Sequence, residues 1–316
     1  MKISVNSIDQ NKMGILYGTA SYVLWGMLPL YWKLVETVPH IQVLGHRIFW
    51  SFIFMVIVVA ITGGWKTIVA IAANRRKLFL MFLCGVIISL NWYVYIYAIN
   101  TDQVIEASMG YFLNPLIVVL LGVLVFKEKL SKWQITALVL AAAGVLLVAL
   151  QYARFPWIAL ALAGTFATYG LIKKIIMVHP ITGLTLETLI VSPVALFYLL
   201  SLEAAGTGAM GSSGWGLILL LAGTGAVTST PLLLYAKGIE NTTFSMMGFL
   251  QYIAPSINLF LGVIVFREYF SLYHFLSFCL IWAGLAIFTL ANLGILKKSP
   301  SLPGVREEKG EVSPGV

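Results

Sequence analysis

Two stretches of this chain match each other closely enough to decide how it is built. Residues 115–131 read PLIVVLLGVLVFKEKLS and residues 255–271 read PSINLFLGVIVFREYFS, with nine of seventeen positions identical at an offset of 140 residues. Gly144 and Gly284 extend the match at the same offset. Similar composition explains scattered Leu and Val, but not a shared spacing of Pro, Gly, Phe, Glu and Ser. The chain is therefore predicted to contain an internal repeat.

The composition of the 316 residues places the repeat in a membrane. Sixty per cent are hydrophobic and 10% are charged, against roughly 45–50% and about 25% in soluble proteins. A soluble enzyme of this size is excluded, because so few charges would not cover its surface. The net charge of +8 suits loops facing anionic lipid better than nucleic acid, for which no basic and aromatic groove is evident. Cys84 and Cys279 lie in apolar runs, so no disulfide framework is expected.

A membrane-spanning helix needs about 20 mostly apolar residues. Ten stretches reach that length, at roughly 13–34, 41–62, 78–99, 103–126, 131–150, 155–175, 181–201, 214–236, 242–266 and 271–294. Residues 63–77, which contain Trp65 and several basic side chains, suit a short interfacial helix. The predicted fold class is an all-α integral membrane protein with ten transmembrane helices.

The repeat assigns five helices to each half of the chain. The first half is expected at 1–150 and the second at 151–298, with a disordered cytoplasmic tail at 299–316. Because five is odd, the two halves must cross the membrane in opposite directions. This 5+5 inverted-topology repeat is a device of transporters, although channels carry repeats too.

The basic residues predict the orientation. With ten crossings and a cytoplasmic N-terminus, sixteen of the twenty Lys and Arg face the cytoplasm and three face outward, while Arg47 remains inside a span. This bias follows the positive-inside rule. We expect a multi-pass protein of the cytoplasmic membrane with both termini inside the cell.

Several short motifs resemble one known group of membrane proteins. They are Trp25-Gly26, Pro29-Leu30-Tyr31-Trp32-Lys33, His46-Arg47, Trp50-Ser51, Asn91-Trp92, Gly110-Tyr111-Phe112, Asn114-Pro115-Leu116, Glu187-Thr188 and Gln251-Tyr252-Ile253. In this order they resemble the RarD branch of the EamA group in the drug/metabolite transporter superfamily, over about residues 12–298. The resemblance implies a central cavity lined mainly by helices 1–4 and 6–9, with helices 5 and 10 at the periphery. It also favours an exporter.

Two buried charges are the foremost candidates for a site. Arg47 and Glu187 lie inside apolar spans and are related by the 140-residue offset, so they occupy mirror-related depths in the two halves. Ionisable residues inside spans are usually functional or paired. We expect both to face the central cavity and to take part in substrate binding or gating; the alternative is that each reaches polar surroundings at its own end. His46 is a candidate carrier of a coupling proton, or else a hydrogen-bonding neighbour of Arg47.

Aromatic and amide side chains supply the remaining candidates. They are Trp25, Asn91, Trp92, Tyr111, Asn114, Gln251 and Tyr252. The alternative for Asn114 and Gln251 is a structural role next to Pro115 and Pro255, each of which frees a backbone carbonyl. Tyr95 and Tyr97 are interpreted as part of an interfacial aromatic belt.

Other motifs are interpreted as structural. Lys127-Glu128 and Arg267-Glu268 are expected to close two tight turns, and Ser131 with Gln134 forms a capping-box pattern. Glu106 is expected to favour the start of its own helix, or less often to face the cavity.

The sequence contains no phosphate loop, no His-Glu-x-x-His and no Cys pair at metal spacing. We therefore expect no cofactor, no metal and no enzymatic activity. The predicted function is a secondary transporter, most simply an exporter, that moves a small organic metabolite or drug-like solute by alternating access. Its expected partners are that solute, the lipid bilayer and a coupling proton, and nothing supports a homo-oligomer. The alternatives are a passive facilitator and a receptor or scaffold that transports nothing.

Overall fold

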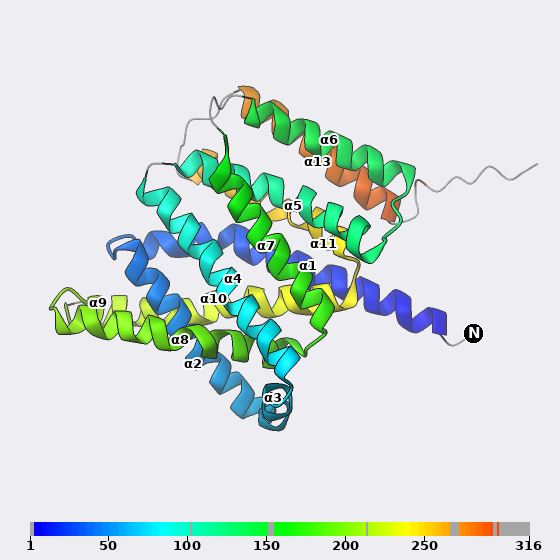
Figure 1. Ribbon diagram of the computed structural model, residues 1–316. Helices are drawn as coiled ribbons and strands as arrows, with labels where there is room; N and C mark the ends of the chain where they lie inside the picture. The colour runs from blue at the N-terminus through cyan, green and yellow to red at the C-terminus, as the bar shows by residue number, and fades with distance from the viewer. Residues whose placement is uncertain are drawn as a thin grey trace, which may run out of the picture.

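A computed structural model describes residues 3–101, 103–150, 155–212, 214–265, 272–292 and 296 (Figure 1). These residues form helices and connecting turns, with no strand among them. The helices are α1 (Ile3–Leu34), α2 (His40–Thr62), α3 (Trp65–Ala72), α4 (Arg75–Asn100), α5 (Val104–Phe126), α6 (Lys132–Ala149), α7 (Trp157–Ile176), α8 (Pro180–Ala204), α9 (Ala209–Ser212), α10 (Trp215–Asn241), α11 (Phe244–Leu250), α12 (Ile253–Phe260), the π-helical turn η1 (Leu261–Val265) and α13 (Leu272–Asn292).

Each apolar stretch of the sequence lies in a helical segment, and the short α3 lies in the predicted interfacial segment 63–77. One stretch, 242–266, is broken into α11, α12 and η1. Pro255 sits in the first turn of α12, where its missing N–H costs no helical hydrogen bond. The expected tail at 299–316 and the Arg267-Glu268 turn lie outside the described residues.

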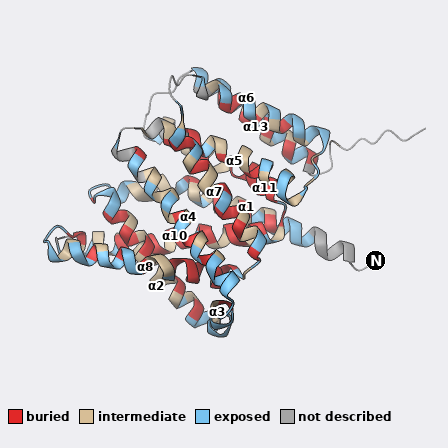
Figure 2. Cartoon of the chain, in the orientation of Figure 1, coloured by how far each residue is buried: buried red, intermediate tan, exposed pale blue. Residues whose placement is uncertain are grey.

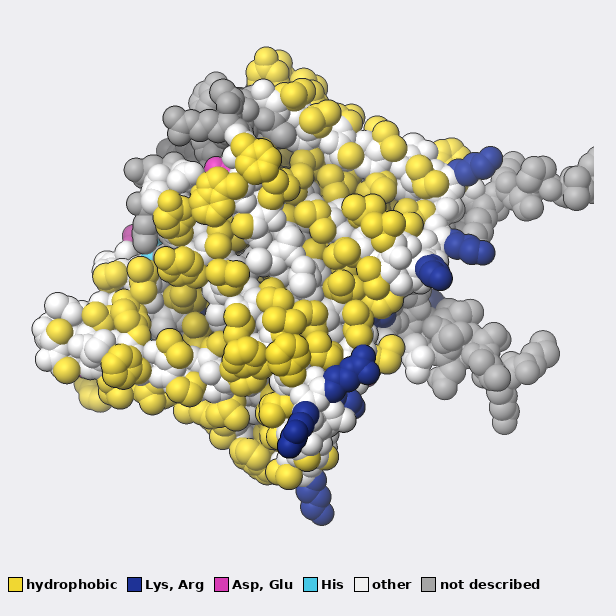
Figure 3. All heavy atoms as spheres, in the orientation of Figure 1, with side chains coloured by type: hydrophobic (Ala, Val, Ile, Leu, Met, Phe, Trp, Pro, Cys, Tyr) yellow, Lys and Arg dark blue, Asp and Glu magenta, His cyan; other side chains and the backbone are white. Residues whose placement is uncertain are grey.

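Eight segments are long and apolar enough to cross a membrane, and α6 and α13 carry shorter apolar stretches. The outward faces of these helices are covered with large apolar side chains, such as Ile61 at 79% exposure and Phe197 at 76%. A surface of this kind would be unfavourable in water and suits contact with lipid. Figure 3 shows this apolar surface, with Lys and Arg gathered toward the end where the chain begins.

The first five long helices pack mainly against the last five. α1 contacts α10 and α12, α4 contacts α7 and α8, α2 contacts α8 and α10, and α5 contacts α7 and α11. α6 and α13 pack against each other at one side of the molecule (Figure 1). The buried residues concentrate where α1, α7, α10 and α11 meet (Figure 2).

The α6–α13 contact shows how the two halves face each other. A side chain at Gly144 would touch the carbonyl of Ser277, and one at Gly284 would touch the carbonyl of Ala137. Ser277 Oγ also donates a hydrogen bond of 2.8 Å to the Gly144 carbonyl. Residue numbers fall along one helix as they rise along the other, so the helices are antiparallel. Adding 140 to Ala137 and Gly144 gives Ser277 and Gly284, so the repeat offset converts one contact into the other.

Candidate functional site

A cavity with an empty volume of about 1140 Å³, including its open mouth, lies between the two halves. Residues of α1, α2, α4, α5, α7, α10, α12 and the α11–α12 junction line it, and we call it the central cavity. Seven of the candidates line it, namely Trp25, Arg47, Asn91, Trp92, Tyr111, Asn114 and Gln251. The structure thus brings together side chains that are up to 226 residues apart in the sequence.

The central cavity lies toward the end of the molecule opposite the N-terminus. Trp32 is close to the last residue of α1, and Arg47 lies seven residues after the first residue of α2. Tyr95 is near the end of α4 and Gly110 near the start of α5. Large buried side chains such as Tyr169, Phe244 and Met247 occupy much of the opposite half, and the cavities described there are smaller.

Arg47 is the charged residue among those that line the central cavity in the described structure. Its guanidinium carbon lies 4.7 Å from the centre of the Trp32 ring and 4.9 Å from that of Trp92. Its Nε donates a 3.2 Å hydrogen bond to Thr228 Oγ1 on α10. The described residues give it no carboxylate partner. Two cation–π contacts therefore hold a positive charge that no Asp or Glu of the described residues neutralises.

Asn91 and Asn114 place amide groups along the same wall. Asn91 Nδ2 donates to the Leu162 carbonyl and to Thr165 Oγ1, both at 2.8 Å. Asn114 Nδ2 donates to the Ala163 carbonyl at 2.8 Å. Because a carbonyl only accepts, these contacts turn both NH2 groups toward α7 and leave both amide oxygens on the other side. Asn114 therefore binds the neighbouring helix, and not the carbonyl freed by Pro115.

Aromatic rings form the rest of the lining. Trp25 packs against Tyr22 and Phe166, with ring centres 5.5 and 5.7 Å apart. Tyr95 meets Tyr111 edge to face at 5.9 Å and lines the central cavity, so its interpretation as a belt residue is wrong. Interfacial belts and cavity walls contain the same aromatic residue types. The rotation of α4 about its axis decides whether Tyr95 faces the lipid or the cavity. Tyr97 is 39% exposed and packs on Trp157.

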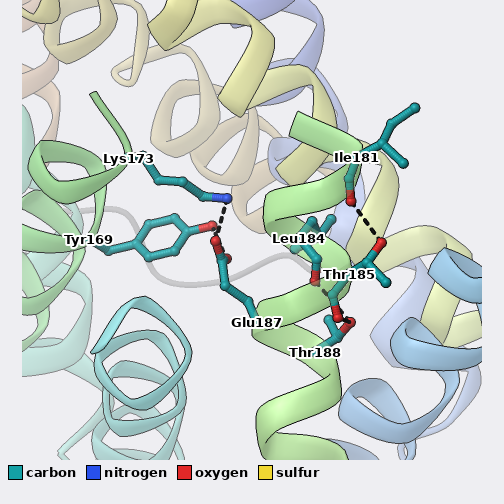
Figure 4. A network of polar contacts seen from close by, with 7 residues as sticks. All are labelled: Tyr169, Lys173, Ile181, Leu184, Thr185, Glu187 and Thr188. Atoms are coloured by element: carbon teal, nitrogen blue, oxygen red, sulfur yellow. Dashed lines mark hydrogen bonds and ion pairs between the residues drawn. The ribbon is translucent and has the colours of Figure 1, made fainter. Parts of the chain in front are cut away.

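Glu187 does not line the central cavity, which corrects the expectation for this residue. Its Oε1 lies 2.5 Å from Lys173 Nζ, and its Oε2 accepts a 3.0 Å hydrogen bond from the Tyr169 hydroxyl (Figure 4). The two charged side chains are 7% and 2% exposed. Lys173 lies near the end of the predicted stretch 155–175, and the last turns of α7, which continues to Ile176, carry its side chain into the bundle.

The Lys173–Glu187 pair nonetheless lies next to the central cavity. Glu187 and Tyr169 line a second, smaller cavity that shares Ile88, Trp92 and Leu232 with the central one. Tyr169 stacks on Tyr235 with ring centres 6.3 Å apart, and Tyr235 in turn contacts Phe166 of the central cavity. The charge pair therefore belongs to the filled half of the bundle.

His46 and Tyr252 line neither cavity. His46 is 2% exposed, and neither ring nitrogen has a hydrogen-bond partner among the described residues. Tyr252 is 1% exposed, and its hydroxyl donates to the Phe112 carbonyl at 3.3 Å. Its position between α5 and the α6–α13 pair gives it a structural role, because it packs with Ala141 and Ile281.

Polar contacts also join the halves at the filled end. Both carboxylate oxygens of Glu128 accept backbone hydrogen bonds at the start of α11, from Phe244 at 2.7 Å and Ser245 at 2.9 Å. Within the second half, Lys174 Nζ donates to the carbonyls of Ile239 and Thr242 at the end of α10. The Lys127-Glu128 turn therefore also ties α5 to α11.

Two further sequence predictions concern helix ends. Ser131 and Gln134 form the predicted capping box, with reciprocal hydrogen bonds of 2.7 and 3.3 Å. Glu106 accepts a 2.7 Å hydrogen bond from the backbone N–H of Ile158, so it caps α7 and not its own helix.

Comparison with known proteins identifies the group to which this architecture belongs. The EamA-like transporter family matches residues 12–150 and 155–290. The chain belongs to the EamA-like transporter family. Relatives of this multi-pass membrane family include the uncharacterized transporter YojE of Bacillus subtilis, 43% identical over 92% of this chain and 98% of its own. The protein RarD of Salmonella typhi is 38% identical over 89% and 96%. A solved crystal structure that is 20% identical shares the fold with a TM-score of 0.64, over 89% of this chain and 98% of that one.

Proposed function

We propose that this EamA-family protein is a secondary transporter that carries a small organic metabolite or drug-like solute across the cytoplasmic membrane. The observation that carries the proposal is the central cavity between the two halves, which lies toward one end of the bundle, while the cavities described toward the other end are smaller. Its lining of aromatic rings with a few amide groups and one guanidinium is typical of sites that bind small organic molecules. A partly polar cavity at the meeting of two repeats is where transporters bind their cargo.

In this proposal the protein has ten membrane spans, arranged as two five-helix repeats of opposite topology, and this arrangement explains how the solute crosses the membrane. Its support is the pair of family matches in successive halves and the antiparallel α6–α13 contact that the repeat offset maps onto itself. Such a contact fits a two-fold axis perpendicular to the helices, which lies in the membrane plane. If each half adopts the arrangement of the other, the open end closes and the filled end opens. This exchange is alternating access.

The orientation follows from charge. The start of α4, the end of α7 and the turn after α5 carry the basic residues Arg75, Arg76, Lys77, Lys127, Lys173 and Lys174. They share the end where α1 begins, so we place that end and both termini in the cytoplasm. In this orientation the structure is open to the outside. Export is the favoured direction because of the family resemblance, and the driving force is an ion gradient or the solute gradient itself.

The test is flux through purified protein in sealed vesicles. Radiolabelled amino acids, nucleobases and amphenicols are screened for uptake and counterflow, with and without a proton gradient. We expect saturable counterflow of at least one solute that protein-free vesicles lack. A loss of accumulation when the proton gradient is collapsed identifies proton coupling, whereas unchanged equilibration identifies a facilitator. Absence of any protein-dependent flux across the panel in correctly folded protein would argue for a receptor or scaffold.

A further inference from the structure

The wall of the central cavity carries a positive charge. Arg47 places a positive charge on its wall, and no Asp or Glu is among the described lining residues. The other buried charge of the bundle, Glu187, is neutralised by Lys173 at 2.5 Å. An unneutralised cation in a low-dielectric site favours an anion as its ligand.

The contacts of Arg47 leave the edge of its guanidinium that carries the two terminal amino groups available to a ligand. The Trp32 and Trp92 rings contact the charge through cation–π interactions and use no N–H group. Thr228 takes the Nε hydrogen. The two terminal amino groups of the guanidinium have no hydrogen-bond partner among the described residues. A planar guanidinium in this state presents two parallel N–H donors, the geometry that binds a carboxylate through both oxygens.

Unpartnered acceptors occur elsewhere on the wall. Asn114 Oδ1, Gln251 Oε1 and Asn258 Oδ1 are buried and have no hydrogen-bond partner among the described residues. All three residues line the central cavity, and Asn114 is 2% exposed. The bond from Asn114 Nδ2 to the Ala163 carbonyl fixes which edge of that amide is free. Buried carbonyl oxygens without partners are stabilised by N–H donors.

We propose that the central cavity binds an organic anion, whose carboxylate pairs with Arg47 and whose N–H group donates to the amide oxygens near Asn114. This inference rests on the proposed transport function and narrows its solute class. The rings of Trp25, Phe166 and Tyr111 suit a flat apolar body between the two polar ends. Organic cations and neutral amides of the same shape are then poor ligands, because each leaves the Arg47 charge without a counter-ion.

The test is calorimetric titration of the full chain in detergent with three probes that share one ring system. Indole-3-acetate is an anion, indole-3-acetamide is neutral and tryptamine is a cation. We expect the acetate to bind about tenfold more tightly than the amide, as one charge-assisted bidentate contact would give, and tryptamine to bind more weakly than both. Benzofuran-3-acetate, which lacks the ring N–H, should bind more weakly than indole-3-acetate. Equal affinities within either comparison, tightest binding of tryptamine, or no binding of any probe to folded protein would overturn the proposal.

Variants assign the effect to Arg47. Arg47→Gln should bind the acetate and the amide equally, while the surface control Lys33→Gln, which also removes a positive charge near the cavity mouth, should keep the tenfold preference. If Arg47→Gln does not fold, Arg47→Lys serves in its place and should keep a reduced preference for the anion. A full preference in Arg47→Gln, or none in Arg47→Lys, contradicts the assignment.

Vesicle flux separates this inference from the transport function. Flux of the acetate and the amide at equal rates would leave transport standing and reject the anion site. Binding of the acetate that depends on Arg47, without flux of any solute, would support the anion site and reject transport.

Discussion

Arg47 in α2 and Glu187 in α8 stand 140 residues apart, at the same place in the two copies of the repeat, yet their surroundings differ. Glu187 is paired with Lys173 and bonded to Tyr169 inside the filled half of the bundle. Arg47 stacks on two indole rings at the wall of an open cavity and has no acidic partner among the described residues. One charge is paired within the protein, and the other has an aromatic environment and is proposed to pair with a solute.

The comparison shows that repeat-related positions can have different environments in one conformation of the protein. The Glu187 position is paired inside the bundle, whereas the Arg47 position lines the central cavity, where we propose that it binds a solute. Charge removal should therefore act mainly on stability at one site and mainly on transport at the other. Four predictions test this contrast.

The largest expected effect is on stability at the filled end. Glu187→Ala leaves Lys173 buried without a partner, which costs about 3–5 kcal/mol. The double variant Glu187→Ala with Lys173→Ala should recover a large part of that loss. The measurement is the midpoint of unfolding in detergent for the two single variants and the double.

A matched control is the Lys33–Glu36 pair, with side chains 61% and 55% exposed. Breaking it should change stability by at most about 1 kcal/mol, because surface ion pairs contribute little. If both pairs cost the same, Glu187 and Lys173 do not form a buried pair that stabilises the bundle.

The second prediction concerns transport at the open end. Arg47→Ala should lower solute flux by roughly 10- to 100-fold, since a hydrogen bond to a charged group contributes about 1.5–3 kcal/mol. Its loss of stability should be smaller than that of Glu187→Ala, because no buried carboxylate is left unpaired. Flux per folded molecule is measured in vesicles, and a rate equal to that of the unmodified protein would leave Arg47 with a structural role.

The third prediction concerns the rings that hold Arg47. Trp32→Leu or Trp92→Leu removes one cation–π contact, worth about 0.5–2 kcal/mol, and should raise the half-saturating solute concentration accordingly. Trp215→Leu is the control, because Trp215 is 82% exposed and far from the central cavity along α10. An identical change in all three variants would point to general effects of losing an indole.

The smallest expected loss of stability is at Glu128, whose carboxylate joins the end of α5 to the start of α11. Glu128→Gln keeps one acceptor but loses the charge that faces the start of α11, and should cost about 1 kcal/mol. Unfolding midpoints check this, with Glu36→Gln as an exposed control. A loss of stability as large as that of Glu187→Ala would mean that Glu128 stabilises the bundle by more than its two hydrogen bonds indicate.

The helices and seven cavity residues could be predicted because they depend on local sequence. Apolar runs fix the spans, and polar residues deep inside them, such as Asn91 and Asn114, must face other helices. The exact end of a helix and its rotation depend on packing, which the sequence does not show. The sequence therefore does not predict that Lys173 pairs with Glu187, that Tyr95 lines the cavity and not a belt, or that Thr228 contacts Arg47. The sequence also does not predict that the helix is interrupted at Gln251, between α11 and α12. The equivalent stretch of α5 contains Pro115 and remains one helix, so the proline alone does not indicate a break.

The interleaving of the two halves has a consequence for how the protein is made. Asn91 in the first half finds its partners at Leu162 and Thr165, Ser21 bonds the Pro231 carbonyl, and Arg47 bonds Thr228. The ribosome delivers α1 to α6 before any of these partners exist. Until the second half is inserted, the polar groups of the newly made half face lipid or one another, where they are costly. Assembly is therefore a late event in synthesis, and a chain that stalls after α6 is a natural target for membrane quality control.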